Sequence, residues 1–361
     1  TGGDSADTFD ATTSLSLNTG DVLKGGGGND TLTAKFATAT TQTVNSTAIE
    51  TFSLTATAAT TLNLASTTGV TTINNQASTA NLVLNNINSV PTTVLINTND
   101  DDTTLNYAAA ALSGTNDQLV NLEGVTANAT VVFTKAAGAA TTDKLETISL
   151  DSGSVTNTLA SVSTTGVGAT TLELSGDQDL VITAAIDNDL TTITSTNTSG
   201  TSLTLGTGGD AFTGGTGDDS VTGNTGDDTI TSGAGADQYT HTAGGDDKIT
   251  LGDGADTVLI ANSIAAADTV TGGAGSDTLN FGANAADMTA AALAKATGFD
   301  VIEVNGAVAV TLADQDLTDS DSNQITINET GANAAVTVNA LVSAGKTVVL
   351  GEAASFTLGD V

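Results

Sequence analysis

The feature that most restricts the fold of this chain is an aspartate that returns about every nine residues. The stretch GGTGDDSVTGNTGDDTITSGAGADQY at 214–239 shows the period, with glycines before each aspartate and an apolar residue two positions after it. Eight aspartates follow one another in steps of nine, nine, nine, ten, nine, twelve and nine residues: Asp210, Asp219, Asp228, Asp237, Asp247, Asp256, Asp268 and Asp277. The apolar residues in phase with them are Phe212, Val221, Ile230, Tyr239, Ile249, Val258, Val270 and Leu279. A run of this length predicts a repeating fold and not a flexible Gly/Asp-rich linker.

Each repeat combines a turn with a short strand. Glycine adopts positive φ without steric cost, so the glycine-rich half of the repeat predicts a tight turn. The three residues around the apolar position predict a strand whose apolar side chain points inward. Strands alternating with turns give a coil that places each aspartate above another, and stacked carboxylates repel each other. A hard cation with many oxygen ligands relieves this repulsion, and calcium fits better than magnesium, which demands a stricter octahedral geometry.

The repeat resembles the RTX (repeat-in-toxin) nonapeptide G-G-x-G-x-D-x-U-x. Residues 25–33, 214–222 and 272–280 match it at every fixed position, whereas Asn224 and Ser232 each replace one glycine of a repeat. The resemblance implies a parallel β-roll with two strands per turn, in which calcium lies between aspartates two repeats apart.

The resemblance also implies which residues hold the ions. The expected aspartate pairs are Asp210 with Asp228 and Asp219 with Asp237, completed by carbonyls of the turns. With the N-terminal islands included, the candidate metal ligands are Asp7, Asp21, Gly26, Gly28, Asp30, Gly208, Asp210, Gly215, Gly217, Asp219, Gly226, Asp228, Gly235, Asp237, Asp247, Gly254, Asp256, Asp268, Gly273, Gly275 and Asp277. The ten-residue step at His241 and the twelve-residue step through NSIAAAD predict breaks in the strict stacking of the later aspartates.

The segment before the nonapeptides has a period of its own. Short motifs such as TTLN, TTIN and LVLN recur between 55 and 205, and their apolar third positions are 9–12 residues apart: Leu62, Ile73, Leu84, Ile96 and Leu105, then Leu172, Ile182, Ile193 and Leu203. Threonine, valine and isoleucine favour strands. Short strands at this spacing indicate either a β-sandwich or a stacked solenoid, and similar neighbours at one period favour the solenoid.

The C-terminal part has the same strand-like motifs and one helical one. The Ala-rich stretch before Gly298 predicts a helix near 286–297 with Gly298 as its C-cap. A second motif, Ile/Leu-Glu-Thr, occurs at Glu50 and Glu146, where the sequence favours a solvated position over a cap between rungs. The acidic runs at 99–102 and 314–323 are ambiguous, and a solvated loop is the favoured interpretation of the second.

The predicted fold class is therefore all-β: an elongated parallel β-solenoid or β-roll with calcium-binding RTX turns and few short helices. Four segments are expected: an RTX segment at 1–33, a Thr/Asn-rich solenoid-like segment at 34–205, a nonapeptide β-roll at 206–281, and a β-rich segment with one short helix at 282–361.

Composition restricts the partners. The formal net charge is -34, with 41 acidic and 7 basic residues. Nucleic acid and anionic membranes need clustered basic residues, so we expect neither, whereas an acidic chain suits a divalent cation. The chain contains no cysteine, which excludes disulfides and thiolate metal sites. We expect no membrane insertion and no enzyme activity, because the single histidine, His241, lies in a repeat and the chain has no G-x-S-x-G motif.

The whole pattern resembles the C-terminal region of RTX-type bacterial surface-layer (S-layer) proteins of the Caulobacter kind. These are cysteine-free, acidic and Thr/Ala/Gly-rich, with nonapeptide islands between β-rich segments. The resemblance implies a calcium-driven, self-assembling coat on a Gram-negative cell surface, exported by type I secretion as part of a longer protein. It makes the chain itself, calcium, and lipopolysaccharide bound through a part outside this sequence the expected partners. A calcium-rigidified stalk of an RTX adhesin and the carrier module of a secreted RTX enzyme remain alternatives.

Overall fold

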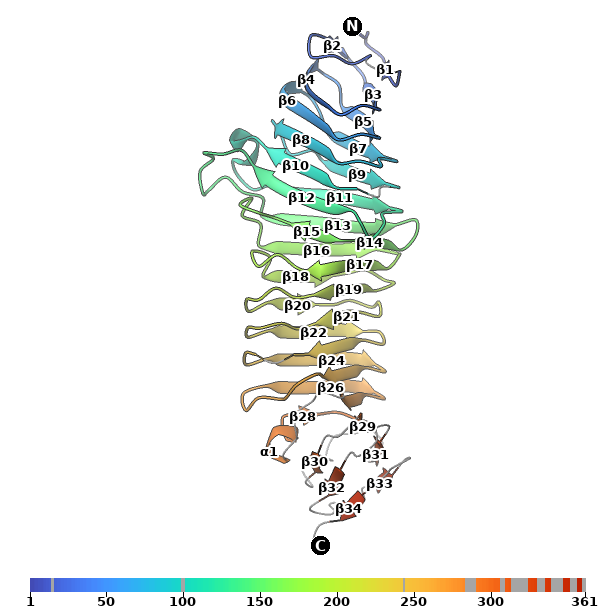
Figure 1. Cartoon of the computed structure of the whole chain (residues 1–361), viewed down its shortest axis with the longest axis vertical. Helices are drawn as coiled ribbons and strands as arrows, with labels where there is room; N and C mark the ends of the chain where they lie inside the picture. Colours follow the sequence, from blue (N-terminus) through green and yellow to red (C-terminus); the bar gives the residue numbers. More distant parts are fainter. Residues whose placement is uncertain are drawn as a thin grey trace. The chain divides into compact units, whose positions relative to one another are not determined.

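The chain is an all-β protein whose parallel sheets form a β-solenoid. The computed structural model describes residues 1–13, 16–98, 101–242, 244–282, 290–305, 309–312, 324–329, 335–338, 347–350 and 356–358. Two compact units are distinguished, Thr1–Leu190 and Thr191–Val361. Figure 1 shows the strands within each unit stacked as successive rungs. No helix in the described ranges is long and apolar enough to cross a membrane.

The first unit contains two long parallel sheets. One consists, in spatial order, of β1 (Thr8–Ala11), β3 (Thr31–Phe36), β5 (Thr51–Ala56), β7 (Thr72–Gln76), β9 (Thr93–Asn97), β11 (Asp117–Glu123), β13 (Thr147–Gly153) and β16 (Thr171–Gly176). The other consists of β2 (Val22–Lys24), β4 (Thr40–Thr47), β6 (Thr60–Thr68), β8 (Leu82–Ile87), β10 (Thr103–Tyr107), β12 (Thr130–Lys135) and β15 (Ser161–Ser163). A further pair is formed by β14 (Asn157–Leu159) and β17 (Leu180–Ala185), and a 3-10 helix, η1, spans Ala109–Leu112.

The second unit repeats the arrangement. One sheet contains β18 (Thr192–Ser195), β20 (Ala211–Thr213), β22 (Thr229–Ala234), β24 (Lys248–Gly254), β26 (Thr269–Gly275) and β28 (Ala296–Thr297). The other contains β19 (Thr201–Thr204), β21 (Ser220–Thr222), β23 (Gln238–His241), β25 (Thr257–Ile260), β27 (Thr278–Phe281), β29 (Val301–Val304), β31 (Gln324–Glu329) and β33 (Thr347–Leu350). A third sheet contains β30 (Ala309–Leu312), β32 (Ala335–Val338) and β34 (Phe356–Leu358).

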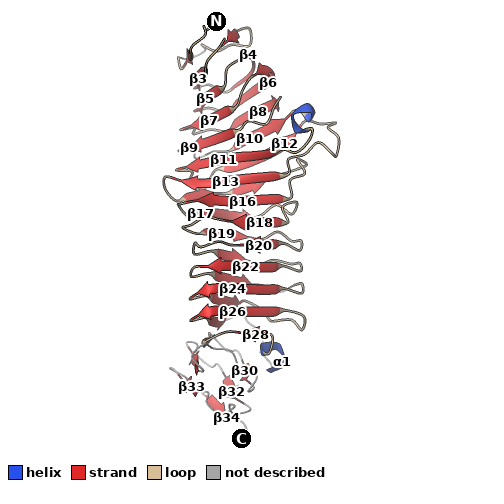
Figure 2. Cartoon of the chain, turned by 180° about the vertical axis from the view of Figure 1, so that it is seen from behind, coloured by secondary structure: helices blue, strands red, loops and turns tan. Residues whose placement is uncertain are grey.

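The pairing pattern decides between the two folds that the sequence left open. In the regular stretches, each strand pairs in parallel with the next strand but one, as in β3 with β5 and β4 with β6. Consecutive strands therefore lie in different sheets and two strands complete one turn. A sandwich of antiparallel hairpins would pair neighbouring strands instead. The segment at 34–190 is thus a solenoid, and Figure 2 shows its strands stacked and joined by loops at both sides.

Alternation along each strand builds the core. All eight apolar residues that follow the spaced aspartates are at most 2% exposed. They stack in register, because Phe212 pairs with Ile230 and Ile230 with Ile249 in one sheet, while Val221 pairs with Tyr239 in the other. The predicted inward positions of the nonapeptides are therefore confirmed.

Two local expectations are wrong. The predicted helix near 286–297 is only the four-residue α1 (Ala290–Leu293) among the described residues, and 286–289 lie outside them. Gly298 is not its C-cap, because β28 follows α1 and adds to the sheet beside β26. A chain that continues as a rung gains backbone pairing that a longer isolated helix would lack.

The longer steps do not break the stack either. Thr229 pairs with Lys248 across the ten-residue step, and Lys248 pairs with Thr269 across the twelve-residue step. The additional residues lie in the turns and leave the strand register intact. The acidic run at 314–323 lies outside the described residues, as do residues 99 and 100.

Candidate metal centre

The spaced aspartates form two columns in the second unit, one at each side of the solenoid. The first column consists of Asp210, Asp228, Asp247 and Asp268, which immediately precede β20, β22, β24 and β26. The second column consists of Asp219, Asp237, Asp256 and Asp277, which precede β21, β23, β25 and β27. Because the paired strands begin in register, the residues before them stack on successive rungs.

One oxygen of each stacked carboxylate is held by the neighbouring rung. In the first column the backbone N–H of Asp210 donates to Oδ1 of Asp228 at 2.9 Å, and the same contact joins Asp228 to Asp247 and Asp247 to Asp268. In the second column the N–H of Asp219 donates to Oδ1 of Asp237 at 2.8 Å, and the series continues through Asp256 to Asp277. The structure thus brings together the expected pairs and extends both columns beyond them.

The second oxygen of several carboxylates has no protein partner. Oδ2 of Asp219, Asp228, Asp237 and Asp256 is buried and accepts no hydrogen bond from the part of the chain that the structure describes. These residues are at most 2% exposed. A buried carboxylate oxygen without a partner is costly, so the columns supply anionic oxygen ligands that an ion would satisfy.

The pKa values of these carboxyl groups also show that burial disfavours their charged form. Burial, together with the nearby charge of Asp237, raises the pKa of Asp219 to about 7. Burial likewise raises the pKa of Asp228 and of Asp237 to about 6, with contributions from the carboxylates of neighbouring rungs. A bound cation reverses this effect, because its charge favours the ionised carboxylates.

The glycines of the motif leave room beside the carboxylates and between the turns. A Cβ on Gly214 would lie 2.5 Å from Oδ2 of Asp219, and one on Gly272 would lie 2.8 Å from Oδ2 of Asp277. Gly235, with φ of 136°, would place a Cβ 2.6 Å from the carbonyl oxygen of Gly217 on the preceding turn. A Cβ would also meet a carbonyl of the adjacent turn at Gly226 (facing Gly208), Gly254 (facing Gly235), Gly273 (facing Gly252) and Gly275 (facing Gly254), and Gly215 would meet that of Ser195.

The donor set fits a calcium ion. No three histidine, cysteine, aspartate or glutamate side chains within the described ranges gather closely enough to hold a metal by themselves. Two stacked carboxylates supplemented by the closely stacked turn carbonyls are instead an all-oxygen set, which is what calcium prefers. The residues that would hold the ion are Asp210, Asp219, Asp228 and Asp237, together with the carbonyls of their turns. Calcium would supply the positive charge that balances these carboxylates.

A third, shorter column begins the first unit. The N–H of Asp7 donates to Oδ1 of Asp30 at 2.7 Å, and the N–H of Asp30 donates to Oε2 of Glu50 at 2.8 Å. Asp30 is fully buried, and its Oδ2 finds no hydrogen-bond donor among the residues described. Gly26 and Gly28 both have positive φ in the turn between Asp21 and Asp30. Asp7 and Asp30, both predicted as metal ligands, therefore lie on adjacent rungs and in contact with each other.

Asp21 has no place in a column. Its Oδ2 accepts a hydrogen bond from the N–H of Asn18 at 2.7 Å within its own turn. The register of β2 on β4 pairs Val22 with Asn45, so the residue on the next rung beside Asp21 is Val44. The nine-residue spacing to Asp30 is met, but no second carboxylate faces Asp21 from that rung.

The glutamates of the Ile/Leu-Glu-Thr motif are partly exposed, but each caps a neighbouring rung, a role that the sequence did not favour. Oε2 of Glu146 accepts the N–H of Asn116 at 2.6 Å, as Oε2 of Glu50 does for Asp30. Asp300 does the same for the N–H of Asp277 at 3.1 Å. The sequence signal was a carboxylate followed by one residue and an apolar one, which Glu50, Glu146 and Asp300 share with the nonapeptide aspartates.

His241 lies in the first column. It is the last residue of β23 and not part of a turn, and it is 2% exposed. Burial lowers the pKa of its imidazole, but the carboxylates of Asp247 and Asp268 outweigh burial, and the net effect is a raised pKa.

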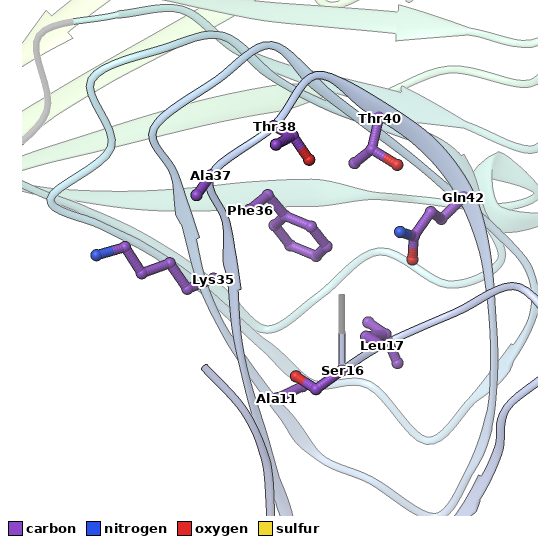
Figure 3. A pocket seen from close by; sticks show the side chains of 9 residues that line it. All are labelled: Ala11, Ser16, Leu17, Lys35, Phe36, Ala37, Thr38, Thr40 and Gln42. Carbon is purple, nitrogen blue, oxygen red and sulfur yellow. The ribbon is translucent and has the colours of Figure 1, made fainter. Parts of the chain in front are cut away.

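A small pocket in the first unit offers different chemistry. Figure 3 shows Phe36 and Leu17 within it, with Lys35 directed away. Its other lining residues are Ala11, Ser16, Ala37, Thr38, Thr40 and Gln42. No carboxylate lines it, so it is not a calcium site of the kind formed by the columns.

The repeats match a known family model. Four segments, residues 18–34, 204–239, 241–259 and 265–285, match the RTX calcium-binding nonapeptide repeat. They include both aspartate columns, so the RTX repeats expected from the sequence are confirmed. No curated protein and no solved structure matches the chain. The repeats imply a secreted, calcium-binding protein of the RTX type.

Proposed function

We propose that this chain is a structural protein of a bacterial surface layer, which folds and assembles into a two-dimensional lattice when it binds calcium outside the cell. The observation that carries the proposal is the pair of buried aspartate columns, in which Oδ2 of Asp219, Asp228, Asp237 and Asp256 has no hydrogen-bond partner among the described residues. A structure that contains so many uncompensated carboxylates depends on an ion.

Calcium dependence gives the protein a switch between two compartments. Where free calcium is low, repulsion and desolvation of the carboxylates disfavour the nonapeptide rungs, and the chain stays open enough for type I export. Outside the cell, calcium binds the folded state and stabilises it by mass action.

The repeating faces support a lattice. Thr8, Thr31, Thr51, Thr72 and Thr93 occupy the same register position on successive strands of one sheet, and all are at least partly exposed. Such a column presents the same polar group at each strand spacing. Contacts that recur at a fixed interval are what a periodic assembly needs.

Negative-stain electron microscopy of the purified chain tests the proposal. We expect ordered sheets in millimolar calcium and none in chelator. The double variant Asp219→Asn/Asp228→Asn should lose the sheets, whereas Asp218→Asn/Asp227→Asn, which removes two exposed carboxylates beside them, should keep them. Separate rods with calcium would contradict the lattice and favour an adhesin stalk or a carrier module. Sheets in chelator would contradict the calcium switch.

A further inference from the structure

One rung of the first column differs from the others at the residue where the preceding strand meets the turn. The register places Leu205, Gly223, His241 and Ile260 at equivalent positions, because Thr204 pairs with Thr222, Thr222 with Thr240, and His241 with Ile260. In the second column the corresponding residues are Gly214, Ser232, Leu251 and Gly272. His241 is the one ionisable residue in either set, and it stands where the preceding rung has the motif glycine Gly223.

The imidazole of His241 lies between two carboxylates of the first column. Its Nδ1 is 3.3 Å from Oδ2 of Asp247, and its Nε2 is 3.4 Å from Oδ2 of Asp268. Nε2 is also 3.0 Å from the carbonyl oxygen of Ser263. At Asp219 and Asp237, Oδ2 has no hydrogen-bond partner among the described residues. At Asp247 and Asp268, by contrast, Oδ2 faces a ring nitrogen of His241.

The irregular steps of the sequence are the ones that build this arrangement. The ten-residue step ends at Asp247 and the twelve-residue step ends at Asp268, which are the two carboxylates that contact His241. The longer turn before Asp268 contains Ser263, whose carbonyl faces Nε2, and Ala265, whose N–H donates to Oδ2 of Asp268. The additional residues thus supply partners that the nine-residue turns do not have.

We propose that the side chain of His241 occupies the place of a calcium ion between Asp247 and Asp268, so that this gap of the first column binds no calcium. The equivalent residue Gly223 has no side chain, whereas the ring of His241 lies against the carboxylate oxygens of Asp247 and Asp268 that calcium would need. In this gap the stacked carboxylates are bridged by a protein side chain, whereas in the neighbouring gaps they are bridged by calcium ions. The inference rests on calcium binding by the columns and is independent of assembly into a lattice.

Counting bound calcium tests the inference. The chain is equilibrated with calcium by dialysis, and the bound ions per chain are measured by atomic emission. His241→Gly restores the glycine found at Gly223, and we expect it to bind one calcium ion more than the unchanged chain. An equal number in both proteins, with β structure retained, would overturn the proposal.

A second variant keeps the test decisive if His241→Gly does not fold. Asp268→Asn preserves an oxygen that can accept the N–H of Asp247. We expect Asp268→Asn to bind as many calcium ions as the unchanged chain, because its gap holds the imidazole. Asp237→Asn, the matched change in the second column, should bind fewer. Loss of calcium from Asp268→Asn equal to that from Asp237→Asn would show that the gap holds an ion and would refute the inference.

Discussion

The two tyrosines of this chain occupy the same kind of position in two chemically different regions. Tyr107 in the Thr/Asn-rich rungs is fully buried, and its hydroxyl donates to Oε1 of Gln118 at 2.8 Å. Tyr239 in the nonapeptide rungs is also fully buried, but its hydroxyl has no hydrogen-bond partner among the described residues, and Asp228 and Asp247 are near enough to influence its pKa.

The same contrast holds for several other buried polar groups, which are neutral in the first unit and carboxylates in the nonapeptides. In the first unit, Asn75 donates through Nδ2 to Oγ1 of Thr103 at 2.8 Å, and Oδ1 of Asn157 accepts the N–H of Val125. In the nonapeptides, Asp219, Asp228, Asp237 and Asp256 are buried carboxylates, each with one oxygen that has no hydrogen-bond partner among the described residues. One backbone architecture therefore supports rungs completed by neutral side chains and rungs that need an ion. The two kinds of rung differ in the residues where strand and turn meet, and not in the strands themselves.

Calcium removal should separate the two regions most clearly. In chelator, we expect the amides of β20–β27 to lose protection from hydrogen exchange, because the aspartate columns repel without an ion. The amides of β6–β13 should remain protected. Segment-resolved exchange measured by mass spectrometry, with and without calcium, checks this expectation. Equal loss in both regions would mean that the neutral rungs depend on the ions as well.

A single carboxylate should have a smaller effect that is confined to calcium binding. Asp228→Asn keeps the shape of the side chain but removes a buried charge that is shared by two gaps. We expect calcium affinity to fall by about tenfold or more, equivalent to about 1.4 kcal/mol. Asp227→Asn, which alters the exposed neighbour, should bind almost normally. Isothermal titration calorimetry compares the two, and equal affinities would exclude a ligand role for Asp228.

In the neutral region, the matching change should cost stability whether or not calcium is present. Asn75→Ala removes the donor to Oγ1 of Thr103 and the acceptor of the Ser78 hydroxyl, and we expect a loss of about 1–3 kcal/mol. Asn74→Ala, on the neighbouring and less buried position, should cost less. Urea unfolding in chelator and in calcium measures both variants. A cost that appears only with calcium would contradict the independence of this region.

The calcium-free nonapeptide rungs should also show a pH dependence of stability. The pKa of Asp219 is raised from 3.8 to about 7 and those of Asp228 and Asp237 to about 6, so the folded state binds protons more tightly than the unfolded state. Its free energy of unfolding should therefore fall as pH rises from about 4 to about 7. Melting curves in chelator at several pH values test this sign, and melting in calcium should not show the decline. A rise with pH in chelator would contradict it.

The repeat period of the sequence was enough to predict which residues point inward and which aspartates stack. It was not enough to predict contacts that depend on side-chain length or on the register between rungs. The inward apolar residues and stacked aspartates follow from one repeat, so Phe212 and Asp228 could be placed in advance. Glu50 could not, because its cap depends on which rung faces Asp30. Asp21 has the right spacing but faces the register position of Val44. His241 looked like an interruption of the pattern, although its contacts with Asp247 and Asp268 form only once three rungs are stacked.

The chain returns to the same sheet after every two repeats, and this restricts which insertions and deletions the fold can accept. From Asp210 to Asp228, eighteen residues complete one turn and restore every side chain to its original sheet and face. Deleting eighteen residues would shorten the stack by one rung and preserve the remaining register. Deleting nine would transfer every later strand to the opposite sheet and set the aspartates of one column against those of the other. For this molecule, the smallest change in length that leaves the neighbours undisturbed is a whole turn.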